Sequence, residues 1–178
     1  MFKIIAIVIV VLLVALLVFA ATKPDTFRVQ RATSIKAPPE KIFVLINDFH
    51  RWVAWSPYEK YEKKDPAMKR TLSGATTGRG AVYEWEGNKD IGKGRMEIMD
   101  TSPPSKVIIT LDFVKPFEAH NILEFTLEPN SDSTNVIWSI HGPSPYISKL
   151  MSIFVNLDSM IGKDFETGLA NLKIVAET

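Results

Sequence analysis

GRGAVYEWEGNKDIGKGRMEI, residues 78–98, contains two short stretches of alternating apolar and polar side chains separated by the turn GNKDIG. Tyr83 and Trp85 would share one face of the first stretch, whereas Glu84 and Glu86 would take the opposite face. Alternation with a period of two is typical of a strand with one buried face. Because the turn is too short to hold a crossover helix, the two strands should pair as an antiparallel hairpin.

The same alternation continues on both sides of this hairpin. Glycine, proline and polar turns separate the alternating stretches, and the intervals leave no room for crossover helices. Residues 27–37 alternate in part and predict a first strand. The pattern then predicts about six further antiparallel strands, at 68–73, 80–87, 93–101, 105–114, 119–128 and 134–141.

Two helical patterns flank this strand region. Pro38-Pro39-Glu40 predicts the start of a first helix, which gives way to the string HRWVAWSPY (50–58), where Pro57 forces a break. Near the C-terminus the period returns to 3.6, and one apolar stripe consists of Ile161, Phe165, Leu169, Leu172 and Ala176. A sheet with one apolar face has to be covered, and the C-terminal helix is the only predicted element long enough. The expected fold class is α+β, with a curved antiparallel sheet around this helix and a space between them. Leu169 and Leu172 should be buried against the sheet.

An uninterrupted apolar run precedes the domain. Ile4–Ala21 comprises eighteen apolar residues, which as a helix would extend about 27 Å, close to the thickness of a bilayer core. The sequence therefore predicts a transmembrane anchor at 1–21, a linker at 22–26 and one domain at 27–178. A cleaved signal peptide is the alternative, because Ala20 offers a small residue before Ala21 at a cleavage position.

The charges around this run predict which side of the membrane the domain occupies. Lys3 lies on the short side of the run, whereas Lys23, Arg28, Arg31 and Lys36 lie on the long side. By the positive-inside rule this asymmetry favours a cytoplasmic domain. The argument loses force if the arginines belong to a strand instead.

Composition excludes several classes of function. The formal net charge is +1, which gives no electrostatic footprint for nucleic acid. The chain has no cysteine, so it has no disulfide, and a structural zinc site is not expected. No other metal and no cofactor are expected.

The titratable side chains form no catalytic motif. Two carboxylate pairs, Glu59 with Glu62 and Glu84 with Glu86, should face water, where their pKa values would not be separated. The histidines lack metal-ligand spacing and are predicted to be solvated on the surface: His50, His120 and His141.

Four strings carry a family resemblance: WVAWSPY (52–58), the hairpin at 78–98, NVIWSIHGP (135–143) and KDFETGLANLKIVAE (163–177). Together they resemble the polyketide cyclase/dehydrase-like branch of the START/Bet v 1-like (SRPBCC) superfamily. The resemblance covers about residues 27–177. It implies a helix-grip fold with an internal hydrophobic cavity, here preceded by one transmembrane helix. It does not fix an activity, because the superfamily contains lipid carriers, hormone receptors and cyclases.

Two groups of side chains are the candidate ligand-binding residues. Five share the predicted inward faces of the strands and would line the cavity, or would fill a closed core: Tyr83, Trp85, Met96, Ile98 and Trp138. The resemblance puts three more near the mouth of the cavity, as a gate or as a plug between helix and sheet: Trp52, Trp55 and Tyr58.

Three functions remain open from the sequence. The leading hypothesis is a membrane-anchored protein that binds a hydrophobic small molecule or lipid in an internal cavity. The second is a polyketide cyclase- or dehydratase-like enzyme, which would need inward polar groups such as Tyr83 or Asn121. The third is a scaffold or stress protein with a collapsed cavity. A cavity volume separates the third hypothesis from the first two.

Overall fold

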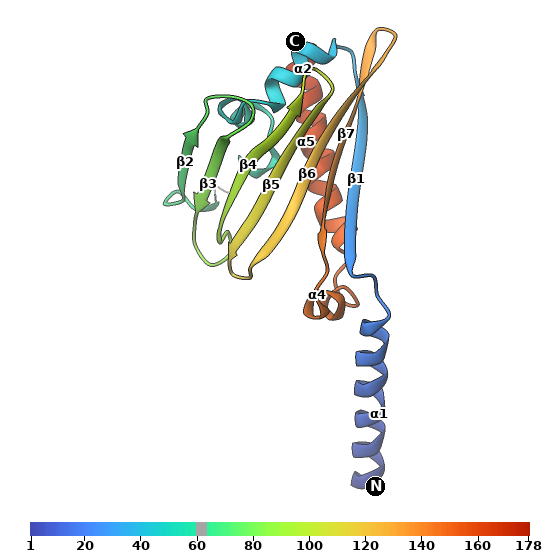
Figure 1. The fold of residues 1–178 in the computed structure, drawn as a ribbon. Coiled ribbons are helices and arrows are strands. Elements are labelled where there is room, and N and C mark those ends of the chain that lie inside the picture. Colours follow the sequence, from blue (N-terminus) through green and yellow to red (C-terminus); the bar gives the residue numbers. More distant parts are fainter. Residues whose placement is uncertain (60–63) are drawn as a thin grey trace.

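The computed structural model describes residues 1–59 and 64–178, and its elements follow the predicted order (Figure 1). A long N-terminal helix leads into a domain of seven strands, short helical segments and a long C-terminal helix. The elements are α1 (Phe2–Ala21), β1 (Thr26–Ile35), α2 (Pro39–Ile46), the 3-10 segments η1 (Phe49–Ala54) and η2 (Pro57–Glu59), β2 (Lys69–Gly74), β3 (Ala81–Glu86), β4 (Lys93–Ser102), β5 (Lys106–Lys115), β6 (Ala119–Asn130), β7 (Ser133–Pro143), α4 (Tyr146–Met151) and α5 (Leu157–Glu177).

The strands form one antiparallel sheet in the order β1-β7-β6-β5-β4-β3-β2. Strands β2 to β7 follow one another as neighbours, and β1 joins the edge beside β7, with Thr26 opposite Pro143. The sheet curves around α5, which lies along its concave face (Figure 1). The predicted α+β fold, with a curved sheet around the C-terminal helix, is confirmed.

The first helical region is held to the sheet through its tryptophans. Pro39 is the first residue of α2, where proline needs no hydrogen-bond donor of its own. The indole N–H of Trp52 donates to the carbonyl of Ile46 at 2.9 Å, and that of Trp55 donates to the carbonyl of Leu45 at 3.1 Å. Both acceptors belong to the last turn of α2, whose carbonyls lack partners within the helix. The two tryptophans thus fix η1 against the end of α2.

The apolar stripe of α5 is buried, as its spacing predicts. Phe165, Leu169 and Leu172 are all buried, which confirms the expectation for Leu169 and Leu172. The ring of Phe165 stacks on Trp138 with centroids 4.1 Å apart and an interplanar angle of 9°. Gly168 permits this close approach, because a Cβ there would lie 2.7 Å from a ring carbon of Trp138. The helix therefore lies very close to the β7 part of the sheet.

An ion cluster fixes the first turns of α5 to β1. Arg31 on β1 donates to Glu166 at 2.7 Å and to Asp158 at 2.9 Å. The hydrogen bond from Arg31 holds the pKa of the Asp158 carboxyl below its usual range. This contact is therefore complete above the ordinary carboxyl pKa and is lost only as the pH falls through the lowered value.

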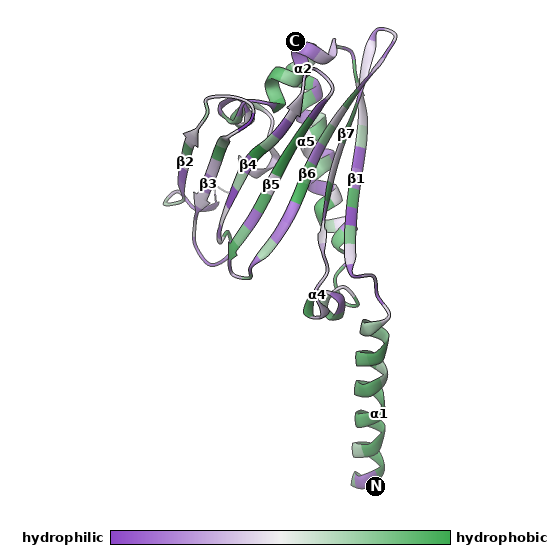
Figure 2. Ribbon diagram, viewed as in Figure 1, coloured by the Kyte–Doolittle hydropathy of each residue, from purple (hydrophilic) through white to green (hydrophobic). Residues whose placement is uncertain are grey.

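The N-terminal helix is apolar from Ile4 to Ala21, and Lys3 in its first turn is its one charged residue (Figure 2). It is long enough and apolar enough to cross a membrane, and Ala20 is its one buried residue. Arg28 and Arg31 lie in β1, so these two charges belong to a strand of the domain. Of the positive charges on the C-terminal side of the helix, Lys23 is therefore the one that lies outside the domain's strands and nearest to the helix.

Candidate ligand-binding site

A cavity of about 350 Å³ lies between the sheet, the 3-10 segments and the first half of α5. It occupies the side of the sheet near β3, β4 and β5, because α5 packs mainly on β1, β7, α2 and the 3-10 segments. The residues that line it are Trp52, Ser56, Tyr58, Met68, Tyr83, Trp85, Asp90, Ile91, Met96, Leu111, Phe113, Lys115, Pro116, Leu123, Met160, Ile161 and Asp164.

The floor of the cavity is a row of side chains from adjacent strands. Tyr83 is opposite Met96 in the pairing of β3 with β4, and Met96 is opposite Leu111 in the pairing of β4 with β5. Residues in register on neighbouring strands point to the same face, so the three side chains form one continuous surface. Trp52 closes this surface from the side of η1, and all four residues are buried.

Trp85 and Phe113 form the wall between the floor and the mouth. Their rings meet edge to face with centroids 5.7 Å apart. Both residues are opposite Gly94 on β4. A Cβ on Gly94 would lie 2.3 Å from the Trp85 ring, so the indole can rest on β4 only because glycine is there. Gly94 thus sets the position of the wall without contributing a side chain.

Five of the eight candidate residues meet at this cavity: Trp52, Tyr58, Tyr83, Trp85 and Met96. The remaining three, Trp55, Ile98 and Trp138, are fully buried in the core and are not among the lining residues. Trp138 is stacked between Phe125 and Phe165, at the place where α5 lies close to the sheet. The part of Trp55, Ile98 and Trp138 in ligand binding remains a prediction.

Several lining residues were not identified from the sequence. Leu111 and Phe113 continue the inward alternation of β5, which could have identified them. Gly94 could have been found from its place two residues before Met96 on the same inward face. Met68 lies directly before β2, Ile91 lies in the β3–β4 turn and Met160 lies in the first turn of α5, and no pattern in the sequence predicts that they contact the cavity.

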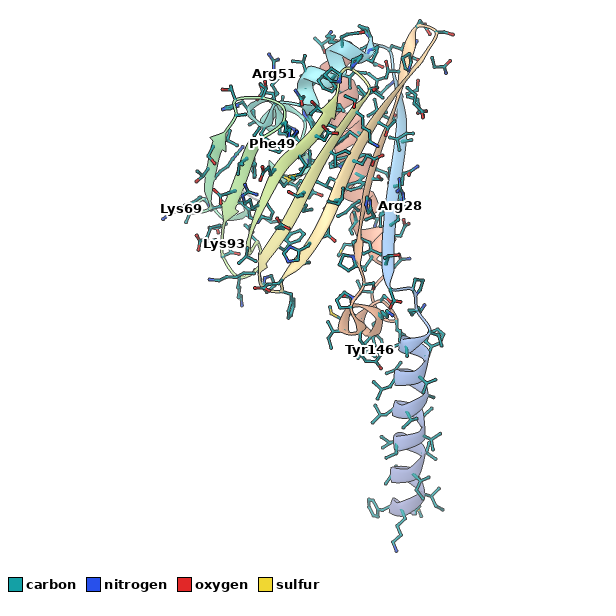
Figure 3. The ribbon with its side chains drawn as sticks, viewed as in Figure 1. Arg28, Phe49, Arg51, Lys69, Lys93 and Tyr146 are labelled. Carbon is teal, nitrogen blue, oxygen red and sulfur yellow. The ribbon has the colours of Figure 1, made fainter. Side chains whose placement is uncertain are left out.

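The mouth of the cavity is charged, in contrast to its floor. Asp90 and Lys115 are lining residues with exposed side chains, and the lining residue Asp164 is half-buried, so we take these charged groups to mark the mouth. At the same end of β3 and β4, Lys93 pairs with Glu86 at 3.0 Å, and Figure 3 shows Lys93 beside Lys69 at this end of the sheet. The hydrogen bond from Lys93 chiefly lowers the pKa of Glu86, and the charges of Lys93, Lys115 and Lys69 lower it further. The arrangement suits a ligand with an apolar body and a polar end.

Polar groups inside the domain are few. Asn121 is buried, as the enzyme hypothesis requires, but it lies against Gly142 and is not among the residues that line the cavity. Ser56 is buried and does line the cavity. Within residues 1–59 and 64–178, no group of three His, Asp or Glu side chains could hold a metal ion.

The histidines and carboxylate pairs lie outside the cavity lining. His50 and His120 are exposed and contact Asp48 and Asp112, as expected of surface histidines. His141 is half-buried with its Nδ1 atom out of contact with solvent, so the prediction of a solvated side chain is wrong for it. Glu84 and Glu86 face water as predicted, whereas Glu62 lies outside the described residues, so the prediction for its pair with Glu59 stays a prediction.

Known structures share this fold at low sequence identity. Protein CV1439 from Chromobacterium violaceum is 16% identical with a TM-score of 0.58, and the match covers 88% of this chain and 99% of that one. Protein Ms6760 from Mycobacterium smegmatis is 16% identical with a TM-score of 0.57, over 86% and 92% of the two chains. Major latex-like protein 151 from Panax ginseng is 13% identical with a TM-score of 0.59, over 87% and 100%.

The sequence comparisons identify the family. No curated protein matches the chain. The profile of the family described as polyketide cyclase/dehydrase and lipid transport matches residues 26–177, which is nearly the whole chain behind α1. This match agrees with the resemblance carried by the tryptophan-rich strings and the central hairpin. The chain therefore belongs to the polyketide cyclase/dehydrase and lipid transport family.

Proposed function

We propose that this protein binds a hydrophobic small molecule or lipid in the cavity between the sheet and α5, and that α1 anchors it in a membrane. The observation that carries the proposal is the contrast between the apolar floor of Tyr83, Met96 and Leu111 and the charged mouth. An apolar body on the floor would keep its polar end at the mouth, in contact with water.

The size and lining of the cavity support this class of ligand. A volume of about 350 Å³ falls within the range of small-molecule sites, about 300–1,000 Å³. Tyr83 and Trp85 offer large apolar surfaces with one polar group each, which suits a partly apolar ligand. The family description, which includes lipid transport, points in the same direction. A scaffold protein with a collapsed interior would lack such a space.

The proposed anchor explains where the ligand would come from. α1 has twenty residues, which corresponds to about 30 Å of helix and matches a bilayer core. Hydrophobic molecules partition into membranes, so a binding protein held at the membrane surface meets them at high local concentration.

Replacing Trp85 with alanine should weaken binding of an apolar fluorescent probe several-fold. An aromatic contact is worth about 1 kcal/mol beyond its buried area, which corresponds to roughly a fivefold change in affinity. The titration would use a fragment lacking residues 2–21, because the core cluster of the described residues includes none from α1. Tryptophan emission of the unmodified fragment should change when the probe binds.

Glu84→Ala is the matched control on the same strand, because the Glu84 side chain is exposed on the outer face. Its affinity for the probe should equal that of the unmodified fragment. Equal weakening by Glu84→Ala and Trp85→Ala, with unchanged melting curves, would contradict the assignment of the inner face. A folded fragment that takes up no apolar probe or lipid would contradict the proposed function.

A further inference from the structure

Most of the exposed large apolar side chains outside α1 lie at one end of the domain. They come from α4, from its connection to α5, from the first turn of α5, and from the end of β5 with the turn that follows it. This apolar end consists of Val114, Phe117, Tyr146, Ile147, Met151, Phe154, Val155 and Met160. Phe117 and Phe154 are both 72% exposed, which is costly for aromatic rings in water. A contiguous exposed apolar surface of this kind is typical of a site that contacts another protein or a membrane.

The mouth of the cavity is at the same end. Strand pairing places Lys69 beside Glu86, Glu86 beside Lys93, and Lys93 beside Lys115, so the turns that follow β3 and β5 lie together. These turns contribute Ile91 and Pro116 to the lining of the cavity. In Figure 1 the end that carries these turns is also the end from which α1 leaves the domain.

Two sets of contacts hold α4 against the end of α1. The hydroxyl of Tyr146 donates to the carbonyl of Leu17 in α1 at 2.9 Å (Figure 3). Behind the helix, the buried Lys149 pairs with Asp25, and the backbone N–H of Ser144 donates to the carbonyl of Asp25 at 2.7 Å. The position of α4 is therefore tied to that of α1.

These contacts set the depth of α4 if α1 spans a bilayer. Leu17 lies four residues before the end of α1, which is about 6 Å along the helix axis. α4 is thus level with the last turn of a spanning helix, and this depth is the interface between hydrocarbon and water. Tyrosine is enriched at this interface, and its ring and hydroxyl suit the two environments.

We infer that α4 and its connection to α5, residues 146–155, lie in the interface of the leaflet where α1 ends. The partner of the apolar end is the bilayer itself, because a membrane-spanning α1 holds α4 next to the bilayer surface in every molecule. The mouth of the cavity then faces the leaflet, and the ligand is an amphiphilic lipid that enters from it. This inference rests on the proposed anchor and ligand class.

The absence of cysteine permits a direct test in the full-length protein. Phe154→Cys and Ile174→Cys would each be labelled with a polarity-sensitive fluorophore and reconstituted into phosphatidylcholine vesicles. The vesicles would contain a lipid with a nitroxide quencher on its headgroup. The two positions are matched, because Phe154 and Ile174 are 72% and 67% exposed, and Ile174 lies near the opposite end of the domain. The label at position 154 should lose most of its fluorescence, whereas the label at position 174 should keep it.

Equal fluorescence from the two labels would overturn the inference. A second result would also overturn the inference. The label at position 154 would report an apolar environment that the nitroxide lipid does not quench, and this signal would grow with the amount of protein per vesicle. A second copy of the protein, and not the bilayer, would then cover the apolar end. Resistance of both variants to carbonate extraction and their binding of an apolar probe report on the anchor and the cavity separately. A failure of docking is thereby distinguished from a failure of the proposed function.

Discussion

Replacing Phe165 with alanine should lower the free energy of unfolding by about 3–5 kcal/mol, the usual cost of truncating a buried phenylalanine. The side chain is completely buried, and its ring stacks on Trp138 at 4.1 Å. Its removal would leave a void between α5 and Trp138 of β7. Because a domain of this size is stabilised by only about 5–15 kcal/mol, the loss should be plain in urea unfolding.

Ile174→Ala is the control within the same helix. Ile174 is exposed, so its truncation should change stability by no more than about 0.5 kcal/mol. If Phe165→Ala does not fold, Phe165→Leu should give a smaller and measurable loss. A Phe165→Ala variant as stable as the original protein would mean that α5 packs on the sheet through another face.

Deleting residues 2–21 should move the protein completely from the membrane fraction to the soluble fraction. The full-length protein should remain in the pellet after an alkaline carbonate wash, because α1 has no polar face with which to leave the bilayer. The melting temperature of the two forms should be similar, since the described core cluster includes no residue of α1.

The alternative explanation for α1, a cleaved signal peptide, can be recognised from the N-terminal sequence of the mature protein. If the apolar run is a cleaved signal peptide, N-terminal sequencing of the mature protein will begin at Ala21 or Thr22. That result, or extraction of the full-length protein by carbonate, would contradict the anchor.

The sequence predicts the strands and the long C-terminal helix of this fold closely, because each of them carries a local signal. The alternation at 93–101 and 134–141 predicts β4 and β7, which occupy Lys93–Ser102 and Ser133–Pro143. The single stripe on the C-terminal helix likewise predicts its buried face. Such periodicities are local, and one sequence is enough to read them.

The position of the cavity could not be predicted in the same way. Inward alternation identifies Met96, Ile98 and Trp138 alike, because all three face the concave side of the sheet. Which of them borders a void depends on where α5 crosses that side. The helix presses on Trp138 and leaves space over Met96, and this difference arises from the placement of α5 over β1 and β7.

The position of the mouth relative to α1 is likewise a property of the assembled fold. Tyr146 and Leu17 are separated by most of the chain, and no local pattern joins them. Their contact requires that β1 return along β7, so that the linker behind α1 meets the start of α4. Sequence reasoning predicted the apolar helix and the cavity as separate features, and in the fold α1 and the turns that border the cavity lie at the same end of the domain.

Native mass spectrometry of the full-length protein, extracted from its own membrane in mild detergent, tests the central claim most directly. The original protein should carry a bound amphiphile as a discrete added mass. Leu111→Trp, which places an indole on the cavity floor, should carry much less of it, whereas Glu84→Trp, with the same indole on the outer face, should carry as much as the original. A folded protein that retains no added mass, or one that retains equal amounts in all three forms, would contradict a ligand-binding cavity.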